Sequence, residues 1–152
     1  MADDTLDLVK DLIQTCKDGE TGYTHAAGVT TDPQLKAYFS EQSLERARFG
    51  QELRLEAERL GDKSEVSSSV PAVLHRVWFE TKAEIGLGDQ SILNSVEQGE
   101  DSAKKAYQKA LSSQLPSDLR EIIQRQAESV LKAHDYVRDM RDGQARPGEE
   151  AA

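Results

Sequence analysis

Cysteine, proline, glycine and aromatic residues are all scarce in this chain of 152 residues. Its one cysteine, Cys16, has no partner for a disulfide within the chain, so nothing in the sequence requires an oxidising compartment. One Trp, four Tyr and three Phe, with ten Gly and four Pro, are too few β-forming and turn-forming residues for a β-sandwich or barrel. The sequence therefore predicts an all-α protein.

Long apolar runs and positive charge are scarce as well. No run approaches the roughly 18 consecutive apolar residues of a membrane span, and the acidic N-terminus lacks the basic and apolar regions of a secretory signal. We therefore expect a cytoplasmic protein. Lysine and arginine number 19 against 28 acidic residues, a formal charge of −9. Because phosphate-rich partners are bound through clustered positive charge, we expect neither nucleic acid nor a membrane surface as a partner.

Four long segments space their apolar residues three and four positions apart, as amphipathic helices do. They cover about residues 4–29, 33–60, 89–110 and 117–142. Asp32 is a candidate N-cap with Pro33 at the first helical position, and Gly61 suits the end of the second helix. Two connections are short, and about 28 residues join the second helix to the third. This pattern predicts a four-helix bundle with a long crossover in a single domain, 1–143, followed by a flexible tail, 144–152.

The long crossover contains an amphipathic stretch from Val70 to about Ile85, which predicts a short helix. A helix of that length is marginal alone in water, so it has to pack against something. Its apolar residues either cover one flank of the bundle or form the patch through which two copies of the chain make a homodimer. These residues are Val73, Leu74, Val77 and Trp78.

The two halves of the chain show an internal similarity. The segment Lys17–Glu20 matches Glu97–Glu100 at an offset of 80 residues, and the segment that ends at Gln42 matches the one that ends at Gln126 at an offset of 84. These matches predict two related helical hairpins joined by the crossover. In this interpretation Glu20 is equivalent to Glu100, and Gln42 to Gln126.

Polar residues stand at positions where the helical periodicity places the core. A buried carboxylate costs several kcal/mol unless a partner compensates it, so Glu20 and Glu100 need an explanation. One interpretation is a salt-bridged, amide-lined layer that fixes the register of the helices. In another, one or both glutamates lie at the edge of the seam, the buried contact between the helices, where they are in contact with water. The predicted layer comprises Glu20, Tyr23, Gln42, Arg46, Glu100, Tyr107 and Gln126.

A third interpretation is a di-iron or di-manganese site. Ferritin-like bundles that hold two metal ions bury a carboxylate from each of two helices and a Glu-x-x-His pair from each of the other two. Glu20 and Glu100 suit the first role, but Glu45 and Glu128 lack the histidine three residues further on. The ligand set of this alternative, with the one histidine that can approach the interior, is Glu20, Glu45, Glu100, Glu128 and His134.

No other catalytic motif is present. The sequence has no glycine-rich phosphate loop, no Cys-x-x-Cys, no His-Glu-x-x-His and no nucleophile elbow. Cys16 lies on an apolar stripe, where a cysteine is more often a small hydrophobe than a reactive thiol. We therefore favour a protein without enzymatic activity and without a metal cofactor, with iron or manganese binding as the alternative.

Five stretches together resemble a known family. They are Cys16-Lys17-Asp18-Gly19-Glu20-x-Gly22-Tyr23, Leu44-Glu45-Arg46-Ala47, His75-Arg76-Val77-Trp78, Gln98-Gly99-Glu100-Asp101 and Lys132-Ala133-His134-Asp135. In combination, from about Leu6 to Gly143, they resemble a bacterial family of ferritin-like four-helix-bundle proteins described as a domain of unknown function. The resemblance implies the ferritin-like fold and a stress-related role. Since both Glu-x-x-His pairs are absent, it implies a polar core in place of a di-iron site.

Overall fold

Four long helices make up the part of the chain that the computed structural model describes, residues 2–62 and 88–143. They are α1 (Ala2–Val29), α2 (Pro33–Arg59), α4 (Asp89–Leu111) and α5 (Ser117–Gly143), and no strand occurs in these two ranges. The all-α prediction is confirmed, with each helix end within two residues of its expected place. The expected crossover helix, with its patch from Val73 to Trp78, and the expected tail, 144–152, lie outside the described residues.

Local chemistry sets the helix ends as the sequence predicts. The Asp32 side chain accepts hydrogen bonds from the backbone N–H groups of Gln34 and Leu35, at 2.8 and 3.4 Å, and Pro33 begins α2. These bonds satisfy donors that have no partner within the helix. Gly61 follows the end of α2 with φ of +99°, a conformation that costs glycine little because it has no Cβ.

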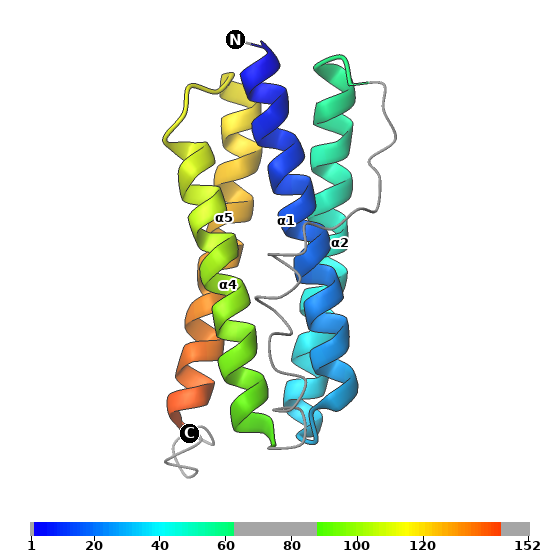
Figure 1. The fold of residues 1–152 in the computed structure, drawn as a ribbon, viewed down its shortest axis with the longest axis vertical. Helices are drawn as coiled ribbons and strands as arrows, with labels where there is room; N and C mark the ends of the chain where they lie inside the picture. Colours follow the sequence, from blue (N-terminus) through cyan, green and yellow to red (C-terminus); the bar gives the residue numbers. More distant parts are fainter. Residues whose placement is uncertain (1, 63–87, 144–152) are drawn as a thin grey trace.

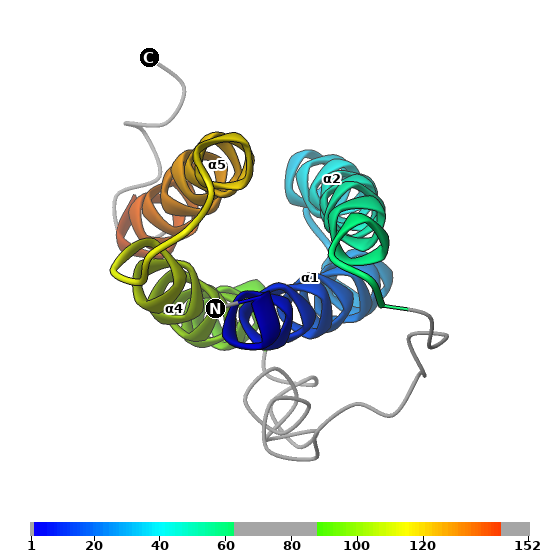
Figure 2. The same ribbon diagram turned by 90° about the horizontal axis from the view of Figure 1, so that it is seen from above.

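The four helices lie side by side in the order α2, α1, α4, α5 when the bundle is viewed along its axis (Figure 2). Within each hairpin the helices are antiparallel, and α2 ends at the opposite end of the bundle from the start of α4 (Figure 1). Because α4 starts at the end of the bundle where α2 also starts (Figure 1), α2 and α4 point in the same direction. An ion pair of 3.3 Å between Lys10 and Asp62 ties the first part of α1 to the end of α2. Within the described ranges, no helix has the length and apolarity to cross a membrane.

Two apolar clusters fill the bundle, one towards each end. The first contains fully buried residues such as Leu12, Leu53 and Ile123, and the second contains Leu35 and Phe39. Complete burial of such a side chain contributes about 1.5–3 kcal/mol to folding. The polar residues described in the next subsection lie between the two clusters, at the middle of the helices.

Asp89, the first residue of α4, ties this helix to the turn between α1 and α2. One carboxylate oxygen accepts hydrogen bonds from the Thr30 hydroxyl (2.9 Å) and the Thr31 backbone N–H (2.8 Å). The other accepts from the Thr31 hydroxyl (2.9 Å) and the Asp32 backbone N–H (3.0 Å). Partial burial by itself raises the pKa of Asp89, but these hydrogen bonds outweigh it and hold the pKa below its ordinary value.

Replacing Asp89 by alanine is expected to lower the free energy of unfolding by about 1–2 kcal/mol, the size of the lost charge-assisted hydrogen bonds at a partly exposed site. Because the pKa is lower in the folded state, this contribution is present above the unfolded pKa of about 3.9 and is lost as the pH falls through the folded pKa. Urea unfolding between pH 3 and pH 7 measures it, with exposed Glu41→Ala as the control. A difference between Asp89→Ala and wild type that stays constant down to pH 3 contradicts the prediction.

Candidate functional site

A buried ion pair lies at the centre of the bundle. Arg46, midway along α2, places Nη2 2.5 Å from Oε2 of Glu100, midway along α4, and the two side chains are 1% and 0% exposed. The Tyr23 hydroxyl from α1 donates a hydrogen bond to the same carboxylate oxygen. The Arg46 guanidinium also lies over the Tyr23 ring, 5.3 Å from its centroid, where the negative face of the ring attracts it. Three helices thus meet at one charged contact.

A second network, whose buried members are uncharged, lies beside the ion pair. The Tyr107 hydroxyl donates to Oε1 of Gln126 at 2.7 Å and lies 3.2 Å from the sulfur of Cys16. The Gln126 amide donates in turn to Glu52 at 2.8 Å, and Glu52 pairs with exposed Arg125 at 2.6 Å. This network therefore runs from the core to the surface between α2 and α5.

The two networks are related by an approximate twofold symmetry. An offset of 84 residues takes Cys16 to Glu100 and Tyr23 to Tyr107. The contact between Cys16 and Tyr107 then corresponds to the contact between Glu100 and Tyr23, and both are present. Gln42 and Gln126, which the same offset relates, are both buried. The prediction of two related hairpins agrees with this symmetry, but the offset of 80 that paired Glu20 with Glu100 is wrong.

The symmetry is broken in the charged residues. The offset of 84 relates Arg46 to Val130 and Glu100 to Cys16, so one side of the symmetry axis is charged and the other is not. We call the side with Arg46 and Glu100 the charged half of the core, and the side with Val130 and Cys16 the uncharged half. The residue that packs against Arg46 also departs from the symmetry: it is Gly19, whereas the offset of 84 places Ala103 at the equivalent position. A Cβ atom on Gly19 would lie 3.0 Å from Nη1 and 3.3 Å from Cγ of Arg46. Gly19 therefore provides the space that the buried arginine occupies.

The ion pair leaves part of its hydrogen-bonding capacity unused. Among the described residues, Nε and Nη1 of Arg46, Oε1 of Glu100 and Oε1 of Gln42 are buried without a hydrogen-bond partner. An unsatisfied buried donor or acceptor costs about 1–3 kcal/mol. The charged half is therefore the more costly of the two to bury.

Burial keeps the Cys16 thiol and the Tyr23 hydroxyl in the core protonated near pH 7. It raises the pKa of the Cys16 thiol to about 11, only partly opposed by the hydrogen bond to Tyr107 and by the charge of Arg46. Burial and the neighbouring Glu100 carboxylate together hold the pKa of Tyr23 well above its ordinary value. Cys16 is thus a neutral thiol near pH 7, which is a poor nucleophile and a poor metal ligand.

Six of the seven residues predicted for the polar layer are buried, and the exception is Glu20. Glu20 is exposed, which corrects its assignment to the core. At this level of α1 the inward position belongs to Gly19, against which Arg46 packs, so the neighbouring Glu20 is turned outward. The possibility that one glutamate lies at the edge of the seam thus holds for Glu20, and the salt-bridged interpretation holds for Glu100.

The five residues of the alternative metal site do not form one ligand set. Glu20 and Glu128 are exposed, and Glu45 accepts a hydrogen bond of 2.5 Å from Ser129. His134 is buried at 6% exposure, but its Nε2 lies 2.8 Å from the Asp101 carboxylate. In residues 2–62 and 88–143 no group of three or more His, Cys, Asp or Glu side chains is arranged to hold a metal ion.

The partners of Tyr107 and the role of Gly19 were not predicted from the sequence. The signal was present, because Cys16 and Tyr23 have the same spacing as Glu100 and Tyr107. The shorter match around Glu20 concealed it.

The fold and the site define an all-α protein, consistent with a four-helix bundle, with a buried ion pair at its centre. The chain belongs to the family described as Domain of unknown function (DUF2383), whose model matches residues 4–113. The matched region includes Arg46 and Glu100 and ends before α5 begins. It confirms the resemblance to a family of unknown function. A search of curated proteins found no match.

Proposed function

We propose that this protein is a non-enzymatic bundle of the ferritin-like class, in which an ion pair stands where metal-loaded relatives of that class hold two metal ions. The observation that carries the proposal is the contact of Arg46 and Tyr23 with Glu100. The ferritin-like assignment is supported by the common direction of α2 and α4 (Figure 1), which a long crossover between them permits.

The residues present do not fit a di-iron or di-manganese centre. One oxygen of Glu100 already accepts hydrogen bonds from Tyr23 and Arg46, so Glu100 would have only its other oxygen, Oε1, to offer a metal ion. The Arg46 guanidinium at 2.5 Å would repel a dication strongly in a buried environment. The other carboxylates of the set face solvent or bind Ser129, so they do not offset this repulsion.

Added iron(II) or manganese(II) is therefore expected to leave the melting temperature of the wild-type protein unchanged. An ion bound at one hundred times its dissociation constant would add about 2.7 kcal/mol, which a melting curve detects easily. The experiment compares the metal response of the wild type with that of Glu100→Gln, and uses Glu128→Gln, at an exposed position of the same set, as the matched control.

A wild type that gains stability with either metal, together with a Glu100→Gln variant that does not, would refute the proposal in favour of the metal-binding alternative. The stress-related role and the cytoplasmic location remain predictions from the sequence.

A further inference from the structure

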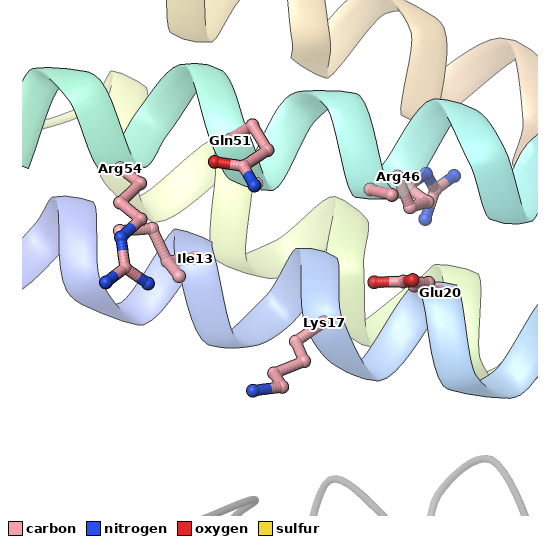
Figure 3. Close-up of a pocket in the computed structure, with 8 residues that line it drawn as sticks. Ile13, Lys17, Glu20, Arg46, Gln51 and Arg54 are labelled. Atoms are coloured by element: carbon pink, nitrogen blue, oxygen red, sulfur yellow. The ribbon is translucent and has the colours of Figure 1, made fainter. Parts of the chain in front are cut away.

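A small pocket of about 130 Å³ opens between α1 and α2, and Arg46 forms part of its lining. Figure 3 shows Arg46 and Glu20 at one end of the pocket, Arg54 at the other, and the Lys17 side chain extending outward between them. Apolar contacts are supplied by Ile13, Ala47 and Gly50. The two small residues on α2 leave the space that longer side chains would fill.

The lining of this pocket is rich in positive charge, although the protein as a whole is acidic. Lys17, Arg46 and Arg54 are cationic, and Glu20 is the one acidic residue of the lining. Arg54 meets Glu58 only at 3.9 Å, a weak pair between side chains one turn apart. Lys17 has no ion-pair partner among the residues that the structure describes. Arg46 is paired with Glu100, so the positive charge that close ion pairs leave unneutralised in this pocket is that of Lys17 and Arg54.

Arg46 adds unused hydrogen-bond donors to this charge. It is 1% exposed, and its Nε and Nη1 atoms have no partner in the described part of the chain. A guanidinium presents its N–H groups in a planar fork that matches the oxygens of a phosphate or carboxylate. A buried arginine with free donors in the lining of a basic pocket is therefore the arrangement that an oxyanion would complete.

We propose that the pocket between α1 and α2 binds a small oxyanion, a phosphate or a carboxylate, through Lys17, Arg54 and Arg46. The carboxylate of Glu20 has the same chemistry as this ligand and lies at the pocket (Figure 3), so it competes with the ligand and weakens its binding. The formal charge of −9 repels anions at long range, but salt screens that repulsion over about 8 Å, and the lining of the pocket contains three cationic side chains and one carboxylate.

Titration of the full chain with inorganic phosphate and, separately, with acetate tests the proposal. Ionic strength is kept constant with sodium chloride, and binding is measured by calorimetry and by the melting temperature. At least one of the two anions is expected to bind and to raise the melting temperature by mass action. Lys17→Gln and Arg54→Gln are each expected to weaken binding about tenfold, the effect of losing one charge-assisted hydrogen bond.

Two further variants make the test specific to the pocket. Glu20→Gln is expected to tighten binding several-fold, because the competing carboxylate is removed. Arg48→Gln changes the net charge by the same amount as Arg54→Gln, but Arg48 is exposed and lies outside the pocket lining, so binding is expected to stay at the wild-type level. The proposal is overturned if neither anion binds, or if Arg48→Gln weakens binding as much as Lys17→Gln and Arg54→Gln.

Discussion

Replacing Arg46 by valine is expected to lower the free energy of unfolding by about 3–5 kcal/mol, because Glu100 would remain buried without its counter-ion. Glu100→Cys is expected to cost a similar amount, since it leaves the Arg46 guanidinium buried and unpaired. Both side chains are almost completely excluded from water, at 1% and 0% exposure, so neither charge can be solvated in place. Urea unfolding followed by circular dichroism measures both losses.

Arg48→Val is the matched control for this prediction, because Arg48 is exposed on the same helix and its replacement is expected to change stability by no more than about 0.5 kcal/mol. If Arg46→Val cost as little as Arg48→Val, the Arg46–Glu100 contact would not be a structural ion pair.

Combining Gly19→Ala, Arg46→Val and Glu100→Cys is expected to restore stability to the wild-type level or above it. These three changes copy into the charged half the residues that the 84-residue offset places in the uncharged half, which are Ala103, Val130 and Cys16. The desolvation cost disappears with the charges, and a buried ion pair replaced by apolar residues is often neutral or stabilising. The Tyr23 hydroxyl would face a thiol, as Tyr107 faces Cys16.

The single change Gly19→Ala is expected to change the free energy of unfolding in opposite directions in the wild type and in the protein that lacks the ion pair. Alanine is favoured over glycine inside a helix by about 0.5–1 kcal/mol. In the wild type, however, the added Cβ atom would meet Arg46 at 3.0 Å, and the bond of Arg46 to Glu100 prevents the arginine from moving away. We therefore expect Gly19→Ala to destabilise the wild type and to stabilise the protein that already carries Arg46→Val and Glu100→Cys.

Non-additivity is the quantity to measure. The loss in the triple variant should be smaller than the sum of the three single losses by more than about 3 kcal/mol, which indicates direct coupling. Additive losses would show that the two halves do not share an equivalent packing environment, and that the approximate symmetry does not extend to their energetics.

The ion pair also constrains how the two hairpins can dock. Arg46 belongs to the first hairpin and Glu100 to the second, and each stands at the middle of its helix. A shift of one helical turn between α2 and α4 would leave both charges buried and unpaired, at a cost of several kcal/mol. The pair thus disfavours a wrong register even if, in the correct register, it adds no net stability over an apolar core.

The sequence by itself determined the helices and most of the buried layer. Helix ends are set by local chemistry, such as the Asp32 cap and the glycine at position 61, and local chemistry can be read directly from the residues. The three- and four-residue spacing likewise identified Gln42, Arg46 and Glu100 as core residues, because a helix of known period has a calculable buried face.

Only the tertiary structure decided which polar residues meet. Glu20 and Gly19 are adjacent and both lie near the seam of α1, and the periodicity cannot choose between them because their directions differ by only about 100°. The choice was made by the partner helix, since the long side chain of Arg46 needs the space above Gly19 and turns Glu20 outward. The sequence offered two offsets, 80 and 84 residues, and the contacts of Tyr107 with Cys16 and of Tyr23 with Glu100 between the hairpins decided in favour of 84.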